Sequence, residues 1–137
     1  MSLDALRNLT DVGLFVADIE RAVAFYGNVL GFELKRRDIG FAEFNTGGIG
    51  LALWEVSDVT EALALEATPR SGLPVMIAVR VETPGAVDVL HGELVSKGVS
   101  IVQPPTTHPW NARTTYFKDP DGNLWEIYSW VNNPRTL

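Results

Sequence analysis

Hydrophobic and polar residues alternate along several short stretches of the chain, and the same order of stretches occurs twice, about 65 residues apart. In each copy a strand-like apolar run leads into an amphipathic helical stretch, then a glycine, and finally another strand-like run. The matching segments are 12–16 and 77–81, 22–23 and 86–87, 31–32 and 98–99, and 51–54 and 125–128. A repeat this small cannot bury its own apolar face. We therefore expect the two copies to pack together, with a shared cavity near a pseudo-twofold axis.

Each copy reads as strand, helix and three strands. In the first copy Asp18 is an N-cap for a helix that Gly31 ends. In the second copy Thr83 is followed by proline at the first helical position, and Gly98 ends that helix. Proline-rich residues 104–110 predict a loop. The expected strands are 11–17, 32–38, 41–46, 49–56, 75–82 and 99–103, with two more around the turn at 119–123.

The length of 137 residues allows one domain made of two intimately packed halves. We place module one at about 9–57, a connector at about 58–73 with a short helix near 59–66, and module two at about 74–131. The predicted fold class is α+β, with the unit βαβββ used twice.

Strand alternation separates a helix-facing set of side chains from a set that faces the other way. The helix-facing positions are uniformly aliphatic. The opposite face mixes aromatic side chains with a few charges, which is typical of a small-molecule site, although a filled core with charges at its rim explains the same pattern. Its members are Asp11, Phe15, Trp54, Met76, Arg80, Glu126 and Tyr128.

Composition limits the partners. A net charge of −6 argues against nucleic acid, because phosphate binding needs clustered Lys and Arg. No apolar run is long enough to span a bilayer, so we expect no membrane partner. The absence of cysteine excludes disulfides and thiolate metal sites, and it agrees with a cytoplasmic protein. A small-molecule ligand is the expected partner.

Two segments carry a family resemblance. Residues 10–18, leading to 24–26 and 30–32, and residues 117–123 before Glu126 resemble the glyoxalase/bleomycin-resistance/dioxygenase (vicinal oxygen chelate) superfamily. The resemblance covers residues 9–131. It implies a curled eight-stranded mixed sheet around a cleft, helices on the outer face, and a homodimer. In the family's enzymes the cleft holds a divalent metal, at positions that correspond here to Asp11, Ala52, Met76 and Glu126.

This chain departs from that ligand set. Ala52 offers no donor, and the thioether of Met76 is a poor ligand for Mg, Mn, Ni or Zn. We therefore expect no metal cofactor, with a weak, water-completed divalent site on Asp11 and Glu126 as the alternative. His91 falls within the second helix and His108 in the proline-rich loop, so neither has the placement expected of a ligand.

The leading functional prediction is a binding protein with a degenerate metal site, which sequesters or senses a small aromatic or cationic ligand. Phe15, Trp54, Met76, Trp110 and Tyr128 supply apolar surface, and Arg80 either pairs with Glu126 or clamps a ligand carboxylate. The alternative is a lyase, isomerase or dioxygenase-like enzyme. It would use a weak divalent metal or a carboxylate general base, with Asp11 and Glu126 as the catalytic residues.

Overall fold

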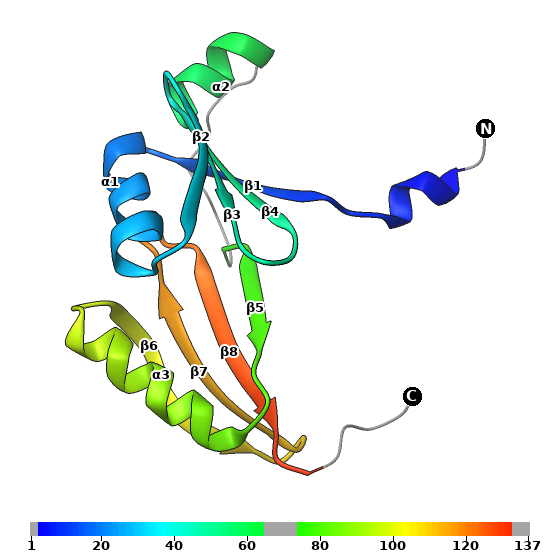
Figure 1. Ribbon diagram of the computed structural model, residues 1–137, viewed down its shortest axis with the longest axis vertical. Coiled ribbons are helices and arrows are strands. Elements are labelled where there is room, and N and C mark those ends of the chain that lie inside the picture. The colour runs from blue at the N-terminus through cyan, green and yellow to red at the C-terminus, as the bar shows by residue number, and fades with distance from the viewer. Residues whose placement is uncertain (1–2, 65–73, 133–137) are drawn as a thin grey trace. The chain divides into compact units, whose positions relative to one another are not determined.

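The computed structural model describes residues 3–64 and 74–132. The chain divides into two compact units, Met1–Pro69 and Arg70–Leu137, and Figure 1 labels the helices and strands of each. Each unit holds one four-stranded mixed sheet with its helices. The predicted α+β class, with βαβββ used twice to give eight strands, is confirmed.

The sheet of unit 1 has the strand order β1-β4-β3-β2. The outer strand β1 runs parallel to β4, and the other neighbours are antiparallel. The predicted strands are all present, with ends that differ by one or two residues. Their bounds are β1 (Asp11–Val16), β2 (Glu33–Asp38), β3 (Phe41–Asn45) and β4 (Gly50–Glu55).

Asp18 begins the first helix as predicted. Its Oδ1 atom accepts hydrogen bonds of 3.0 and 3.2 Å from two backbone N–H groups in the first turn of α1 (Ile19–Val23). The sequence predicts one continuous helix, but the second half widens into the π-helix η2 (Ala24–Val29). Gly31, with a φ of 80°, ends it, because this left-handed conformation costs glycine little.

Two further helices flank these elements in unit 1. The short 3-10 helix η1 (Leu3–Arg7) precedes β1, and α2 (Val56–Leu63) follows β4. The sequence predicts α2 to begin three residues later than it does. The rest of the predicted connector, residues 65–73, lies outside the described residues.

The core of unit 1 forms where α1 packs on β3 and β4. Leu53, Val16 and Phe44 are fully buried on the helix-facing side. Tyr26 of η2 is also fully buried, and its ring lies parallel to that of Phe32 at 6.4 Å. Of the helix-facing positions predicted from alternation, Leu14, Val16, Leu51 and Leu53 belong to this core.

Unit 2 repeats this plan with the strand order β5-β8-β7-β6. β5 (Met76–Arg80) is parallel to β8 (Leu124–Trp130), and β7 (Ala112–Lys118) is antiparallel to both β8 and β6 (Ser100–His108). The helix α3 (Pro84–Ser96) packs against β6, β7 and β8. No described helix is long and apolar enough to cross a membrane.

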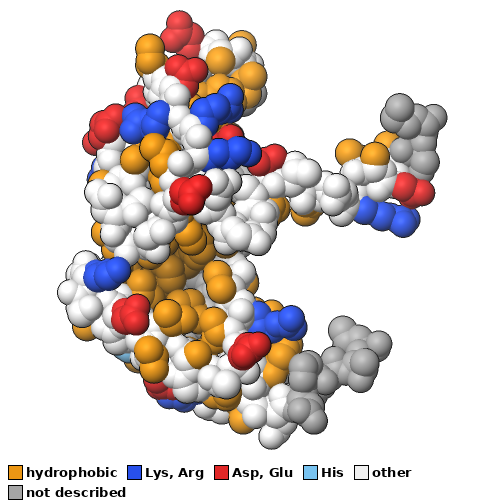
Figure 2. Space-filling view, in the orientation of Figure 1, with side chains coloured by type: hydrophobic (Ala, Val, Ile, Leu, Met, Phe, Trp, Pro, Cys, Tyr) orange, Lys and Arg blue, Asp and Glu red, His pale blue; other side chains and the backbone are white. Residues whose placement is uncertain are grey.

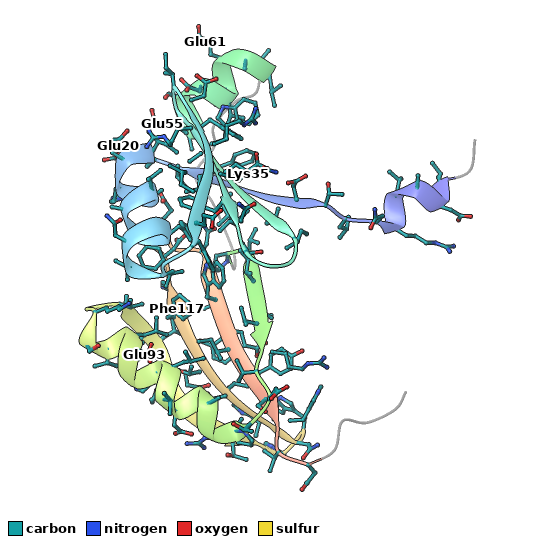
Figure 3. All side chains as sticks on the ribbon, in the orientation of Figure 1. Glu20, Lys35, Glu55, Glu61, Glu93 and Phe117 are labelled. Atoms are coloured by element: carbon teal, nitrogen blue, oxygen red, sulfur yellow. The ribbon has the colours of Figure 1, made fainter. Side chains whose placement is uncertain are left out.

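Both predicted ends of α3 are confirmed. The Thr83 hydroxyl accepts the first-turn backbone N–H of Ala86 at 3.2 Å, and Gly98 has a φ of 74° just beyond the helix. Beneath α3, the buried rings of Phe117 and Trp125 stack 5.7 Å apart. Figure 3 shows Phe117 on the side of β7 that faces α3.

The prediction of a loop at 104–110 is wrong for residues 104–108, because β6 continues to His108, whereas residues 109 and 110 lie in a turn. β6 is an edge strand, and its register with β7 shifts between Gln103 and Thr106, where the two prolines lie. Proline lacks the N–H that a sheet ladder needs, and edge strands and bulges tolerate that loss. The strand therefore continues past its prolines, which lie at a register shift, instead of ending at them.

The turn between β7 and β8 is held by the buried Asp119. One of its carboxylate oxygens accepts the backbone N–H groups of Asp121 and Asn123 at 2.9 and 2.8 Å, and the other accepts the Asn123 side chain at 2.9 Å. Gly122 takes a φ of 83°. The predicted turn is confirmed, and its role is structural.

Candidate functional site: the open faces of the two sheets

Each sheet has a face that its helices do not cover, which we call the open face of that unit. Side chains alternate between the two faces of a strand. On β1 and β4 the buried, helix-facing residues are Leu14, Val16, Leu51 and Leu53, so the residues between them point to the open face. All seven residues that alternation predicted for this face lie on strands β1, β4, β5 and β8, at the expected parity.

An aromatic row crosses the open face of unit 1. Trp54 of β4 is the register partner of Phe15 on one side and of Phe41 on the other. Phe15 is 52% exposed, which is unusual for a phenylalanine inside a strand. The guanidinium of Arg36 lies 4.9 Å from the centre of the Phe41 ring, a cation–π contact. Phe15 and Trp54, predicted separately as ligand residues, are thus neighbours.

The charged part of the same face lies around Glu43. Its carboxylate is largely buried and has the ammonium of Lys35 at 3.7 Å and the guanidinium of Arg36 at 3.6 Å. Both cations reach it because the register of β2 shifts between residues 34 and 36. Figure 3 shows Lys35 on the side of β2 away from α1, whereas Glu20 and Glu55 lie beside α1. Basic and acidic side chains are mixed on this part of the surface (Figure 2).

Asp11 belongs to a pocket of about 500 Å³ that Lys35 and Glu43 also line. The Asp11 carboxylate accepts a hydrogen bond from Thr10 Oγ1 at 2.7 Å. It also lies over Gly50, where an added Cβ would approach within 2.4 Å of Oδ1. The missing side chain at position 50 therefore makes room for this carboxylate. Glu55 faces the other way, and its side chain accepts the Ile19 N–H at 2.9 Å.

Glu126 is the carboxylate of the open face in unit 2, and it is already engaged. Tyr116, its register partner on β7, donates its hydroxyl to Glu126 Oε2 at 2.5 Å. Burial raises the pKa of Tyr116, and the adjacent carboxylate raises it further. A phenol that keeps its proton stays a donor, so Tyr116 fixes one oxygen of Glu126.

Arg80 does not pair with Glu126. Its register partner is Tyr128, and no described residue makes an ion pair or hydrogen bond with its side chain. Met76 lies at the opposite end of β5 and is 51% exposed. Figure 2 shows hydrophobic side chains gathered over the part of unit 2 that β5 and β8 occupy.

Trp110 lies in the turn just beyond β6. Its ring stacks on the imidazole of His108 at 4.1 Å and 7°, and it remains 56% exposed. His108 Nε2 lies 2.8 Å from the hydroxyl of the buried Thr114. His91, in contrast, sits on α3 with Nδ1 3.4 Å from the hydroxyl of Thr115, on the helix side of the sheet.

The residues at the family's metal positions do not fit a divalent ion held by side chains. Such a site needs three or four donors. Among the four positions Ala52 has none, Met76 offers a thioether, and one Glu126 oxygen accepts from Tyr116. Within the described part of the chain, no group of three His, Cys, Asp or Glu side chains is placed to hold a metal ion.

Alternation could have found three residues that the sequence reasoning missed. Ala42 and Phe44 are buried toward the helix, which leaves Phe41 and Glu43 on the open face. The same logic on β7 assigns Tyr116 to the open face. Their partners were not predictable, because cross-strand neighbours depend on register.

The fold defines a small protein of two tandem βαβββ modules, and each sheet has an open face with aromatic and charged side chains. The profile of the Glyoxalase/Bleomycin resistance protein/Dioxygenase superfamily matches residues 8–127. The chain belongs to this superfamily.

Named relatives point to more than one activity. A crystal structure of a glyoxalase/bleomycin resistance protein/dioxygenase from Nocardioides is 36% identical, with a TM-score of 0.86, over 95% of this chain and 89% of that one. The bleomycin resistance protein of Geobacillus stearothermophilus is 28% identical over 86% of this chain and 93% of its own. The metallothiol transferase FosB of Lysinibacillus sphaericus is 28% identical over 83% of this chain and 76% of its own.

Proposed function

We propose that this protein binds a small aromatic molecule on its open faces and sequesters or senses it without a metal. The observation that carries the proposal is the row formed by Phe15, Trp54 and Phe41. Aromatic side chains left exposed on a sheet face provide stacking surface for a planar ligand. On unit 2, Met76, Trp110 and Tyr128 extend the predicted binding set.

The charges favour an aromatic ligand over a simple cation. Glu43 has two basic neighbours, Glu126 accepts from Tyr116, and Asp11 accepts from Thr10. A ligand cation would have to compete with these partners. Aromatic stacking on Phe15 meets no such competitor among the described ring contacts, since Phe15 is more than half exposed, and Trp110 remains more than half exposed beside His108.

The names of two relatives support different branches of this proposal. A bleomycin resistance protein by its name acts on a drug, which agrees with sequestration. A metallothiol transferase is by its name a metal-dependent enzyme, which keeps the enzymatic alternative in view.

The second candidate is a lyase, isomerase or dioxygenase-like activity. Its carboxylate would be Glu126, with Asp11 as the other predicted catalytic residue. The contact between Tyr116 and Glu126 is the observation that favours it, because it places a hydroxyl that can donate a proton against a carboxylate that can accept one. The same contact engages one Glu126 oxygen, which makes this carboxylate a poorer ligand for a metal. We therefore rank this candidate second.

A two-part experiment tests the proposal. Chelator-treated protein is titrated calorimetrically with Mg, Mn, Ni, Co and Zn, and the indole N–H signals are then followed by NMR during titration with 2-naphthylmethanol. We expect no stoichiometric metal binding and a saturable shift of the Trp54 signal. Trp54→Ala should weaken the binding about tenfold.

Trp125→Phe is the matched control, because Trp125 is buried in the core and away from the open face. It should leave the affinity for 2-naphthylmethanol unchanged. Stoichiometric metal binding that Glu126→Gln abolishes would overturn the metal-free proposal in favour of the enzyme. A homodimer and a cytoplasmic location remain predictions.

A further inference from the structure

We infer that the open face of unit 2 binds an aromatic molecule that carries a carboxylate, and that Arg80 binds this carboxylate at the end of that face. This inference rests on the proposed function and names the ligand class more narrowly. The feature that carries it is a cleft at the carboxyl ends of β5 and β8 that contains Arg80, whose side chain has no ion pair or hydrogen bond with any residue that the structure describes.

Two acidic side chains of unit 2, Glu126 and Asp88, have partners other than Arg80. Glu126 accepts from Tyr116, and Asp88 of α3 is held by Arg113 at 2.7 and 2.8 Å. Among the described residues none neutralises Arg80. A guanidinium offers a planar fork of donors that matches a carboxylate, so the free group is suited to a bidentate contact.

The cleft combines that cation with an aromatic wall. It has a volume of about 870 Å³, within the range of small-molecule sites, and Arg80 and Trp130 both line it. The Trp130 ring meets the ring of Tyr128 edge to face at 5.7 Å, and Tyr128 is the register partner of Arg80. A planar ligand against Trp130 would place an attached carboxylate near the guanidinium.

The overall negative charge of the chain means that an anionic ligand depends on a local cation for its binding. At a net charge of −6 the chain repels an anion, so selective binding of one requires a site such as Arg80. Glu82 lines the same cleft and opposes an anion, but it makes no ion pair with Arg80 among the described contacts. Glu82 therefore provides an opposite test. Removing its charge should raise the affinity for an anionic ligand, whereas removing the charge of Arg80 should lower it.

The experiment compares three probes of one shape on the full chain. Benzoate, neutral benzamide and cationic benzamidine are titrated while the Trp130 indole N–H signal is followed by NMR, with Trp130→Phe to assign it. We expect benzoate to bind most tightly. Arg80→Gln should weaken benzoate about tenfold and leave benzamide unchanged, whereas Glu82→Gln should strengthen benzoate about twofold. Added salt should weaken benzoate only when Arg80 is present.

Arg80 and Glu82 are both exposed, so neither substitution should perturb folding, and circular dichroism checks this. Equal or tighter binding of benzamide or benzamidine would overturn the inference while leaving the proposed aromatic site standing. Unchanged benzoate affinity in Arg80→Gln would do the same. If none of the probes, nor 2-naphthylmethanol, shifts any indole signal, the proposed function fails and the inference fails with it.

Discussion

The hydroxyl of Tyr116 donates to Glu126 Oε2 at 2.5 Å, between register partners on neighbouring strands. In unit 1 the positions that correspond by strand and register are Glu43 and Ala52. One unit therefore keeps a carboxylate at the family position and ties it to a phenol. The other unit has lost that carboxylate and carries a different one on the next strand.

Tyr116→Phe should lower the free energy of unfolding by about 1 kcal/mol, because it removes a hydrogen bond to a charged group that water only partly replaces. Urea unfolding measures the change. A double-mutant cycle with Glu126→Gln isolates the pairwise energy. If the two substitutions are simply additive, the contact does not contribute to stability.

The ion pair between Asp88 and Arg113 should make stability depend on pH. The hydrogen bond from Arg113 holds the pKa of Asp88 below its ordinary value, so the pair stabilises the folded state above that value. The contribution is lost as the pH falls through the lowered pKa of the folded state. Asp88→Asn should thus be less stable than the wild type at neutral pH and equal to it in acid.

Urea unfolding of both proteins at several pH values from neutral to about pH 2 checks this sign, since an unperturbed aspartate titrates at about 3.9 and the pKa of Asp88 lies lower. A difference that is constant over the whole range would contradict it. The Arg113 guanidinium stays charged throughout, because its own pKa is raised by Asp88. The pH dependence therefore belongs to the carboxyl group.

Gly40→Ala should destabilise unit 1 by more than about 1 kcal/mol. Gly40 has a φ of 65°, and an added Cβ would lie too close to the Asp58 carboxylate of α2. Gly92→Ala is the matched control, because Gly92 lies inside α3 with nothing within 4 Å of the added atom. It should stabilise the helix by about 0.5–1 kcal/mol. The same sign for both variants in thermal unfolding would refute the prediction.

Replacing Trp125 and replacing Trp54 should have different effects on stability and on ligand affinity. Trp125→Ala removes a buried ring stacked on Phe117 and should cost about 3–5 kcal/mol. Trp54→Ala changes the open face and should cost less stability while it reduces ligand affinity. Equal losses of stability in urea unfolding would mean that Trp54 belongs to a filled core.

The sequence alone determined the elements and the sides of the sheets. Asp18, Thr83 and Pro84 mark helix starts, Gly31 and Gly98 mark helix ends, and strand alternation separates Leu53 from Trp54. These signals succeed because caps and alternation act over a few residues. The π-helix at Ala24–Val29 and the continuation of β6 through its prolines were not predicted, since both depend on packing and on the position of the strand in its sheet.

Only the tertiary structure decided which charges meet. Sequence alternation left open whether Arg80 pairs with Glu126, because both were assigned to one face. Register instead places Tyr116 beside Glu126 and Tyr128 beside Arg80, and within the described part of the chain the guanidinium has no acidic partner. Likewise, a register shift in β2 brings Lys35 and Arg36 to Glu43. Such pairings join side chains on different strands, and hydrogen-bond register fixes them where residue order cannot.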